Sequence, residues 1–177
     1  MLLFQTKVFY NFAKLVKIKD MAKEKERKFL VNSPIFREMA VKKCEIMQAY
    51  LSRSVDATIR IRVFNDEARL TVKSKNQGDL RNEWEYTIPR EDAEEMLTLC
   101  QEPPLTKTRW IVPYADRLWE VDECHGPLEG LTVAEIELPE GFGDKPLTDV
   151  PEFVGKEVTD NPAYYNSNLI KHGKPNE

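Results

Sequence analysis

The chain has 177 residues, of which 41% are hydrophobic and 32% are charged, and its formal net charge is −4. This length is enough for one domain with a real core, so a second domain is not required. The acidic balance argues against duplex nucleic acid as a general partner, because phosphate backbones bind mainly basic surfaces. The three widely spaced cysteines form no CxxC motif, which favours a reducing, cytoplasmic setting.

The first 20 residues are largely apolar, but Lys7, Lys14, Lys17 and Lys19 interrupt them, so no membrane-spanning segment is predicted. Met21 stands directly before the charged stretch KEKERK, where a natural start would fall. We therefore expect residues 1–20 to be a mis-called start or a dispensable extension, with a weak signal peptide or a membrane-surface helix as the alternatives. Residues 21–177 are expected to form a single domain.

Short alternating segments separated by turn residues predict an antiparallel, mainly β domain with peripheral helices. Strands are expected near 23–31, 57–64, 68–75, 82–88, 106–112, 117–123 and 132–138, and an eighth near 45–52. That number suffices for a closed barrel. The segment 89–100 has apolar residues at helical spacing, and a short C-terminal helix is expected near 161–170, after Asp160 or Asn161. The connections at 76–79 and 125–130 and the loop at 140–151 are rich in turn residues.

Several of these strands carry like charges two residues apart, which places the charges on one face of each strand. Arg60 and Arg62 alternate with isoleucines, and Glu135 and Glu137 alternate with Ile136 and its apolar neighbours. For any single pair, a solvated outer surface is the ordinary interpretation. Taken together, the apolar faces are needed under the helix at 89–100, so the charges should lie on the opposite side of the sheet. If the sheet closes, they line a wet tunnel, because unpaired buried charge is too costly.

The order of the charged segments resembles the CYTH domain, also called the triphosphate tunnel metalloenzyme family. The chain has the Glu-x-Glu-x-Lys motif of that family at Glu24, Glu26 and Lys28, followed by IRIR, LTVKS, NEWEY, KTRW, WEVDE and VAEIEL. The match extends from residue 22 to about residue 169. It implies a closed antiparallel eight-stranded β-barrel, forming a hydrophilic tunnel that binds a triphosphate with Mg²⁺ or Mn²⁺.

The resemblance assigns a role to each charged position, and the residue chemistry agrees with it. Carboxylates suit hard divalent cations, and arginine and lysine suit phosphate oxygens. The expected metal ligands are Glu24, Glu26 and Glu137. The expected substrate-binding residues are Lys28, Arg60, Arg62, Lys73, Lys107 and Arg109. The candidates for a second metal or for orienting water are Glu85, Asp122 and Glu135. The alternatives are a surface carboxylate patch and a structural network of ion pairs.

Metal-dependent hydrolysis of inorganic triphosphate to pyrophosphate and phosphate is the leading expectation. The enzymatic alternatives are a class IV adenylate cyclase and a nucleoside or thiamine triphosphatase. A module that binds polyphosphate without turnover is the non-enzymatic alternative. Tyr50, Trp84, Trp110 and Trp119 could stack on a base, but such residues more often pack a barrel. Some family members place a lysine in the closing C-terminal helix, whereas here the nearest is Lys171. A homodimer is compatible with the family.

Overall fold

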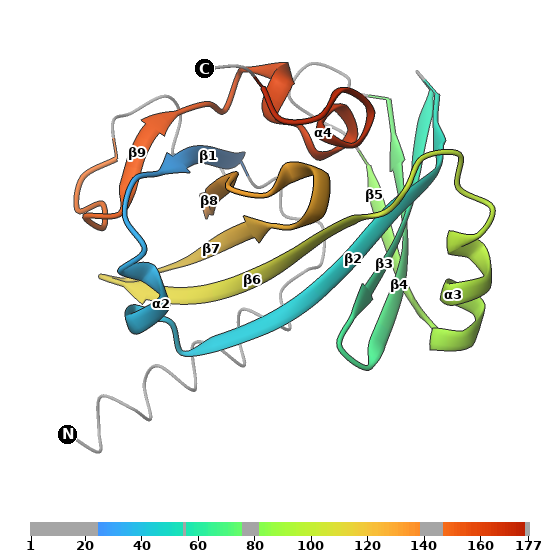
Figure 1. Ribbon diagram of the computed structural model, residues 1–177, viewed down its shortest axis with the longest axis horizontal. Helices are drawn as coiled ribbons and strands as arrows, with labels where there is room; N and C mark the ends of the chain where they lie inside the picture. Colours follow the sequence, from blue (N-terminus) through green and yellow to red (C-terminus); the bar gives the residue numbers. More distant parts are fainter. Residues whose placement is uncertain (1–24, 55, 76–81, 139–146, 176–177) are drawn as a thin grey trace.

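The computed structural model describes residues 25–54, 56–75, 82–138 and 147–175. Nine strands form one sheet in the order β5-β4-β3-β2-β6-β7-β8-β1-β9, and neighbouring strands run antiparallel (Figure 1). The strands are β1 (Lys25–Val31), β2 (Lys42–Arg53), β3 (Ala57–Phe64), β4 (Glu67–Ser74), β5 (Glu83–Ile88), β6 (Leu105–Tyr114), β7 (Arg117–Cys124), β8 (Thr132–Leu138) and β9 (Val154–Glu157). The antiparallel, mainly β prediction is therefore confirmed.

The expected closed barrel of eight strands is not confirmed, because the sheet has nine strands and stays open, with β5 and β9 at its edges within the described residues. A strand has two hydrogen-bonding edges. One edge of β1 pairs with β8, and the other pairs with β9 through Phe29 and Val31. The unpredicted strand β9 thus occupies the edge of β1 that β5 would need in order to close the ring.

The outer face of the sheet carries two apolar clusters. In the first, Phe29, Trp119 and Phe153 pack together beside α2 (Phe36–Met39). In the second, Ile61 and Val63 of β3 lie under α3 (Arg90–Leu97), which corresponds to the helix predicted at 89–100. Figure 1 shows α3 beside β3 and β4, on the side away from β1. The apolar residues of the IRIR segment are thus used for packing, which leaves its arginines on the other face.

A third apolar cluster lies at one end of the opposite face. The 3₁₀ helix η2 (Pro162–Tyr164) and α4 (Asn166–His172) place Tyr164 and Leu169 against Leu105 and Val133. We call this cluster the apolar plug. The 3₁₀ helix η1 (Gly126–Leu128) adds Leu128 to it.

None of the helices in the described part of the chain is long and apolar enough to cross a membrane. The segment 1–20, the 76–79 connection and most of the 140–151 loop lie outside the described residues.

Candidate functional site

Many charged side chains share the face of the sheet opposite to α2 and α3. Directly paired residues of antiparallel strands point to the same side, and the register pairs Lys28 with Glu135, Lys73 with Glu83, and Arg109 with Asp122. We call this the charged face. Its cations include Lys28, Arg60, Arg62, Arg69, Lys73, Lys107 and Arg109, and its anions include Glu26, Glu83, Glu85, Glu120, Asp122, Glu135 and Glu137.

The sheet curves enough to bring distant strands of this face into electrostatic range. Lys73 of β4 lowers the pKa of Glu26 on β1, although five strands separate them in the sheet. Arg109 of β6 likewise lowers the pKa of Arg62 on β3. Basic and acidic residues from distant strands of the charged face therefore lie within electrostatic range of one another.

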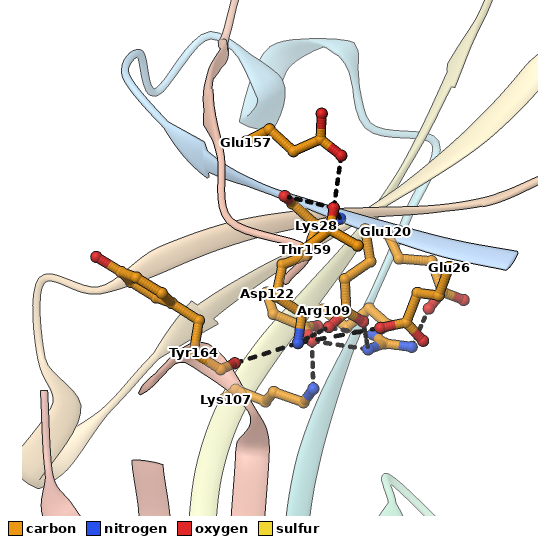
Figure 2. Close-up of polar contacts among 10 residues, drawn as sticks. Glu26, Lys28, Lys107, Arg109, Glu120, Asp122, Glu157, Thr159 and Tyr164 are labelled. Atoms are coloured by element: carbon orange, nitrogen blue, oxygen red, sulfur yellow. Dashed lines mark hydrogen bonds and ion pairs between the residues drawn. The ribbon is translucent and has the colours of Figure 1, made fainter. Parts of the chain in front are cut away.

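Arg109 is the centre of the most buried part of the site (Figure 2). Its Nε and Nη2 atoms each lie 2.7 Å from an oxygen of Asp122, which makes the pair bidentate. The same guanidinium pairs with Glu120 and donates to Glu135 Oε2 over 3.1 Å. Lys107 also pairs with Asp122, and both of these side chains are only 1% exposed. Asp122 is thus enclosed by two cations.

Lys28 connects this cluster to the first strand and to the C-terminal segment. Its Nζ atom lies 2.7 Å from Glu135 Oε1 and 4.0 Å from Glu26 Oε1, and it donates to the Tyr164 carbonyl over 3.3 Å (Figure 2). A cation predicted to bind phosphate therefore also contacts the backbone at the edge of the apolar plug.

A second group of ion pairs lies on β3, β4 and β5. Glu85 accepts hydrogen bonds from Arg62 over 2.9 Å and from Arg69 over 2.7 Å, and Thr71 donates to it over 3.2 Å. The guanidinium groups of Arg62 and Arg69 both lie over the ring of Phe64. The ring and the carboxylate fix the two arginines side by side. Next to them, Lys73 pairs with Glu83 over 2.7 Å, and Arg60 lies 4.0 Å from Glu83.

The pKa values reflect this pairing. Burial alone would raise the pKa of Asp122, but Arg109 and Lys107 hold it far below its ordinary value. Burial lowers the pKa of Lys107, and Asp122 opposes that shift. Burial also lowers the pKa of Arg62 to about 10, with help from Arg60 and Arg109. Arg62 therefore stays protonated at neutral pH.

Carboxylates lie close together where β1, β8 and β7 meet. Glu26 is opposite Glu137, and Glu120 is opposite Glu135. Like charges in such positions repel, and the charge of Glu135, followed by burial, raises the pKa of Glu26 to about 7. An added cation would relieve this repulsion, and carboxylate oxygens are the donors that Mg²⁺ and Mn²⁺ prefer. These residues therefore fit a hard divalent cation, although within the described residues no three acidic, histidine or cysteine side chains already converge on one point.

The structure places every described residue of the predicted site on the charged face, and their individual roles stay predictions. Glu24 lies outside the described residues. Sequence reasoning missed Arg69 and Thr71, although both alternate with Lys73 in the segment ARLTVK. Both bond to Glu85.

The aromatic side chains divide between the two faces. Trp110 and Trp119 pack in the outer core, as expected for packing residues. Trp84 alternates with Glu83 and Glu85 and so faces away from the site. Tyr50, opposite Arg60, is the one of the four predicted aromatics that lies on the charged face.

Comparisons with known proteins agree with the geometry. The family model of the CYTH domain matches residues 22–159. An inorganic triphosphatase from Acetivibrio thermocellus is 42% identical over 153 residues, which cover 86% of this chain and 96% of that protein. The crystal structure of the inorganic triphosphatase NE1496 is 28% identical, with a TM-score of 0.64, and the match covers 85% of this chain and 95% of that one. HpAC1 from Hippeastrum, described as having a dominant triphosphatase activity, shares the fold at 16% identity and a TM-score of 0.52, over 66% of this chain and 80% of that one. The chain belongs to the CYTH domain family.

Proposed function

We propose that this protein hydrolyses inorganic triphosphate to pyrophosphate and phosphate with the help of a divalent cation. The observation that carries the proposal is the charged face, on which basic and acidic side chains from distant strands are brought together. The similarity to inorganic triphosphatases supports the same substrate.

The cations are proposed to bind the phosphate chain. Arg60, Arg62 and Arg109 offer planar groups that can contact two phosphate oxygens each, and Lys28, Lys73 and Lys107 act as point charges. In the structure these cations are paired with carboxylates. A bound triphosphate would take over some of those interactions, so we expect binding to rearrange the ion pairs.

The charge balance supports the need for a metal. Because the cations of the charged face are already paired with carboxylates, a triphosphate entering alone would leave several negative charges uncompensated in a partly buried site. We propose that Glu26 and Glu137, together with Glu24, hold Mg²⁺ or Mn²⁺. When bound, such an ion neutralises phosphate charge and helps to position the substrate.

The remaining carboxylates are proposed to organise the reaction. Phosphoryl transfer depends mainly on positioning and on charge stabilisation. Glu85 and Glu135 each face two basic side chains, and either could accept a proton from the attacking water or orient it. The two cation contacts of Asp122 favour a role in fixing Lys107 and Arg109, beside the water-orienting role that its position in the family pattern suggests.

The test is a substrate panel. Phosphate release is measured with inorganic triphosphate, ATP and thiamine triphosphate, each with Mg²⁺ and with Mn²⁺, and cyclic AMP is measured with ATP. We expect triphosphate to have the highest kcat/KM and EDTA to abolish turnover. Cyclic AMP as the main product would instead make the protein a cyclase, and tight triphosphate binding without turnover of any substrate would make it a binding module.

The cellular setting is also proposed. Cys44, Cys100 and Cys124 are all free thiols, in agreement with a reducing, cytoplasmic location. A small triphosphate as the partner, with neither nucleic acid nor membrane, fits the acidic composition. A homodimer is compatible with this function, and sedimentation velocity would test it.

A further inference from the structure

Gln48 of β2 is a polar residue to which neither the sequence pattern nor the proposed function gives a role. It is opposite Arg62 on β3 and Leu105 on β6, so it shares the charged face. Its side chain is 0% exposed. Within the described residues, neither the amide oxygen nor the amide nitrogen has a hydrogen-bond partner.

A buried amide in this condition is costly. Leaving a buried polar group unpaired costs about 1–3 kcal/mol, and most such groups in folded proteins have a partner. A methionine or leucine of similar size would fill the same space without this cost. An amide at this place is therefore expected to serve a contact that the ligand-free protein does not make.

The neighbours of Gln48 indicate what that contact is. Arg62 is next to it on β3, and the Nε atom of Arg62 is likewise buried without a hydrogen-bond partner among the described residues. Ile46, two residues earlier on the same face, is opposite Lys107. Two unused N–H donors and a nearby ammonium group together suit an acceptor that carries negative charge, which is the chemistry of a phosphate oxygen.

The position of Gln48 also indicates which phosphate it would meet. Leu105, its partner on β6, belongs to the apolar plug formed with Tyr164 and Leu169. Gln48 thus stands at the boundary between the charged residues and the plug. Along β6, a phosphate chain that follows Arg109 and Lys107 would end at this boundary, because Leu105 and Leu169 beyond it offer no donors.

We propose that the Gln48 amide donates a hydrogen bond to a terminal phosphoryl group of the substrate, beside Arg62, at the end of the charged face that the plug closes. This inference rests on the proposed function. It adds a recognition element for an unsubstituted terminal phosphate, because a nucleoside attached to that phosphate would have to displace the plug.

The test compares Gln48→Met with wild type and with Ile46→Met, a buried control on the same strand and face. The first measurement is the melting temperature without ligand. We expect Gln48→Met to melt at or above the wild-type temperature, because it removes an unpaired amide. The second is the rise in melting temperature caused by triphosphate in EDTA, which we expect to shrink in Gln48→Met and to persist in Ile46→Met. The third is KM for triphosphate with Mn²⁺, which should rise on the order of 10-fold to 100-fold, the value of one hydrogen bond to a charged group.

Gln48→Glu is the second variant, and it keeps the test decisive if the Gln48→Met protein does not fold. It has nearly the same shape but places a negative charge beside the phosphate, so triphosphate binding should fall further than in Gln48→Met. Unchanged KM and unchanged triphosphate-induced stabilisation in the folded variants would overturn the inference while leaving the proposed function intact. If wild type binds triphosphate without hydrolysing it, the proposed function fails, and the binding measurements still decide the role of Gln48.

Discussion

Asp122 shows how one residue can organise a site without touching the solvent. It is almost completely buried, yet its pKa lies far below the ordinary range because Arg109 and Lys107 both bond to it. A buried pair of this kind adds little to stability overall, but removing one partner leaves the other charge without compensation. Asp122 therefore holds Lys107 and Arg109 in place, and the stability of the folded protein depends strongly on it.

Replacing Asp122 with asparagine should destabilise the protein strongly. The change leaves the charges of Lys107 and Arg109 without their shared carboxylate, and we expect a loss of about 3–5 kcal/mol in the free energy of unfolding. Urea denaturation at pH 7 measures it. Asp116→Asn, on the exposed turn between β6 and β7, is the matched control and should change stability by less than about 0.5 kcal/mol. Equal stabilities of the two variants would contradict the role given to Asp122.

For Glu26, in contrast to Asp122, we predict that removing the charge stabilises the protein. Its folded-state pKa is about 7, above the ordinary 4.5, so between these values the folded state binds more protons than the unfolded state. The metal-free protein should therefore lose stability as pH rises from 5 to 7. Glu26→Gln removes this titration and should melt above wild type at pH 8 in EDTA, with little difference at pH 5. Thermal melts at the two pH values measure it, and a variant that is less stable at pH 8 would argue against repulsion at Glu26.

At the scale of elements, strand alternation accounts for the success of the sequence-based prediction, and the pairing of β1 with β9 accounts for its failure. Period-2 alternation in segments such as TIRIR predicted the strands and the face of each charge, because burial of Ile61 and Val63 under α3 leaves the arginines no other side. The pattern could not predict β9, since VGKE has only four residues and pairs through its backbone. Whether a sheet closes into a barrel depends on which strands pair at its edges. The alternation of residue types alone therefore could not predict that this sheet stays open.

The C-terminal helix α4 should depend on the apolar plug. Leu169 is 1% exposed within the plug, and Arg53 of β2 donates to the Ser167 carbonyl over 2.7 Å. Leu169→Ala should weaken the docking of α4 by about 2–5 kcal/mol, the usual cost of such a cavity. Hydrogen exchange should then become faster at α4 and η2 while β2 and β3 stay protected. Lys171→Ala, at an exposed position of the same helix, is the control. Equal exchange rates in the two variants would mean that the plug does not hold the helix.

For the whole molecule, the balance of charge predicts that metal and triphosphate bind cooperatively. Either ligand alone disturbs a charged face whose cations and carboxylates are already paired, whereas together they compensate each other, and a favourable coupling of this kind is reciprocal. The rise in melting temperature with Mn²⁺ and triphosphate together should exceed the sum of the two separate rises, at matched ionic strength. Additive shifts would contradict the proposed metal site. Double replacement of Glu26 and Glu137 by glutamine should abolish the excess.

The sequence identified most of the charged residues of the site but not all of its polar residues. Ordered charged segments identified nearly all of the charged face, because residue type and spacing determine chemistry and side. Arg69 and Gln48 were missed for different reasons. Arg69 follows the alternation but lies outside the charged segments that resemble the family. Gln48 stands out only once the structure shows that its amide is buried without a hydrogen-bond partner among the described residues.

Within the described residues no strand lies beyond β5, and this edge has a consequence for self-association. An uncovered strand edge can recruit the same strand of another molecule and begin aggregation. Glu83 and Glu85 lie along this strand, and two copies aligned edge to edge would bring carboxylates of both chains near one another. We expect charged side chains on this edge strand to disfavour such pairing, as they do at other sheet edges.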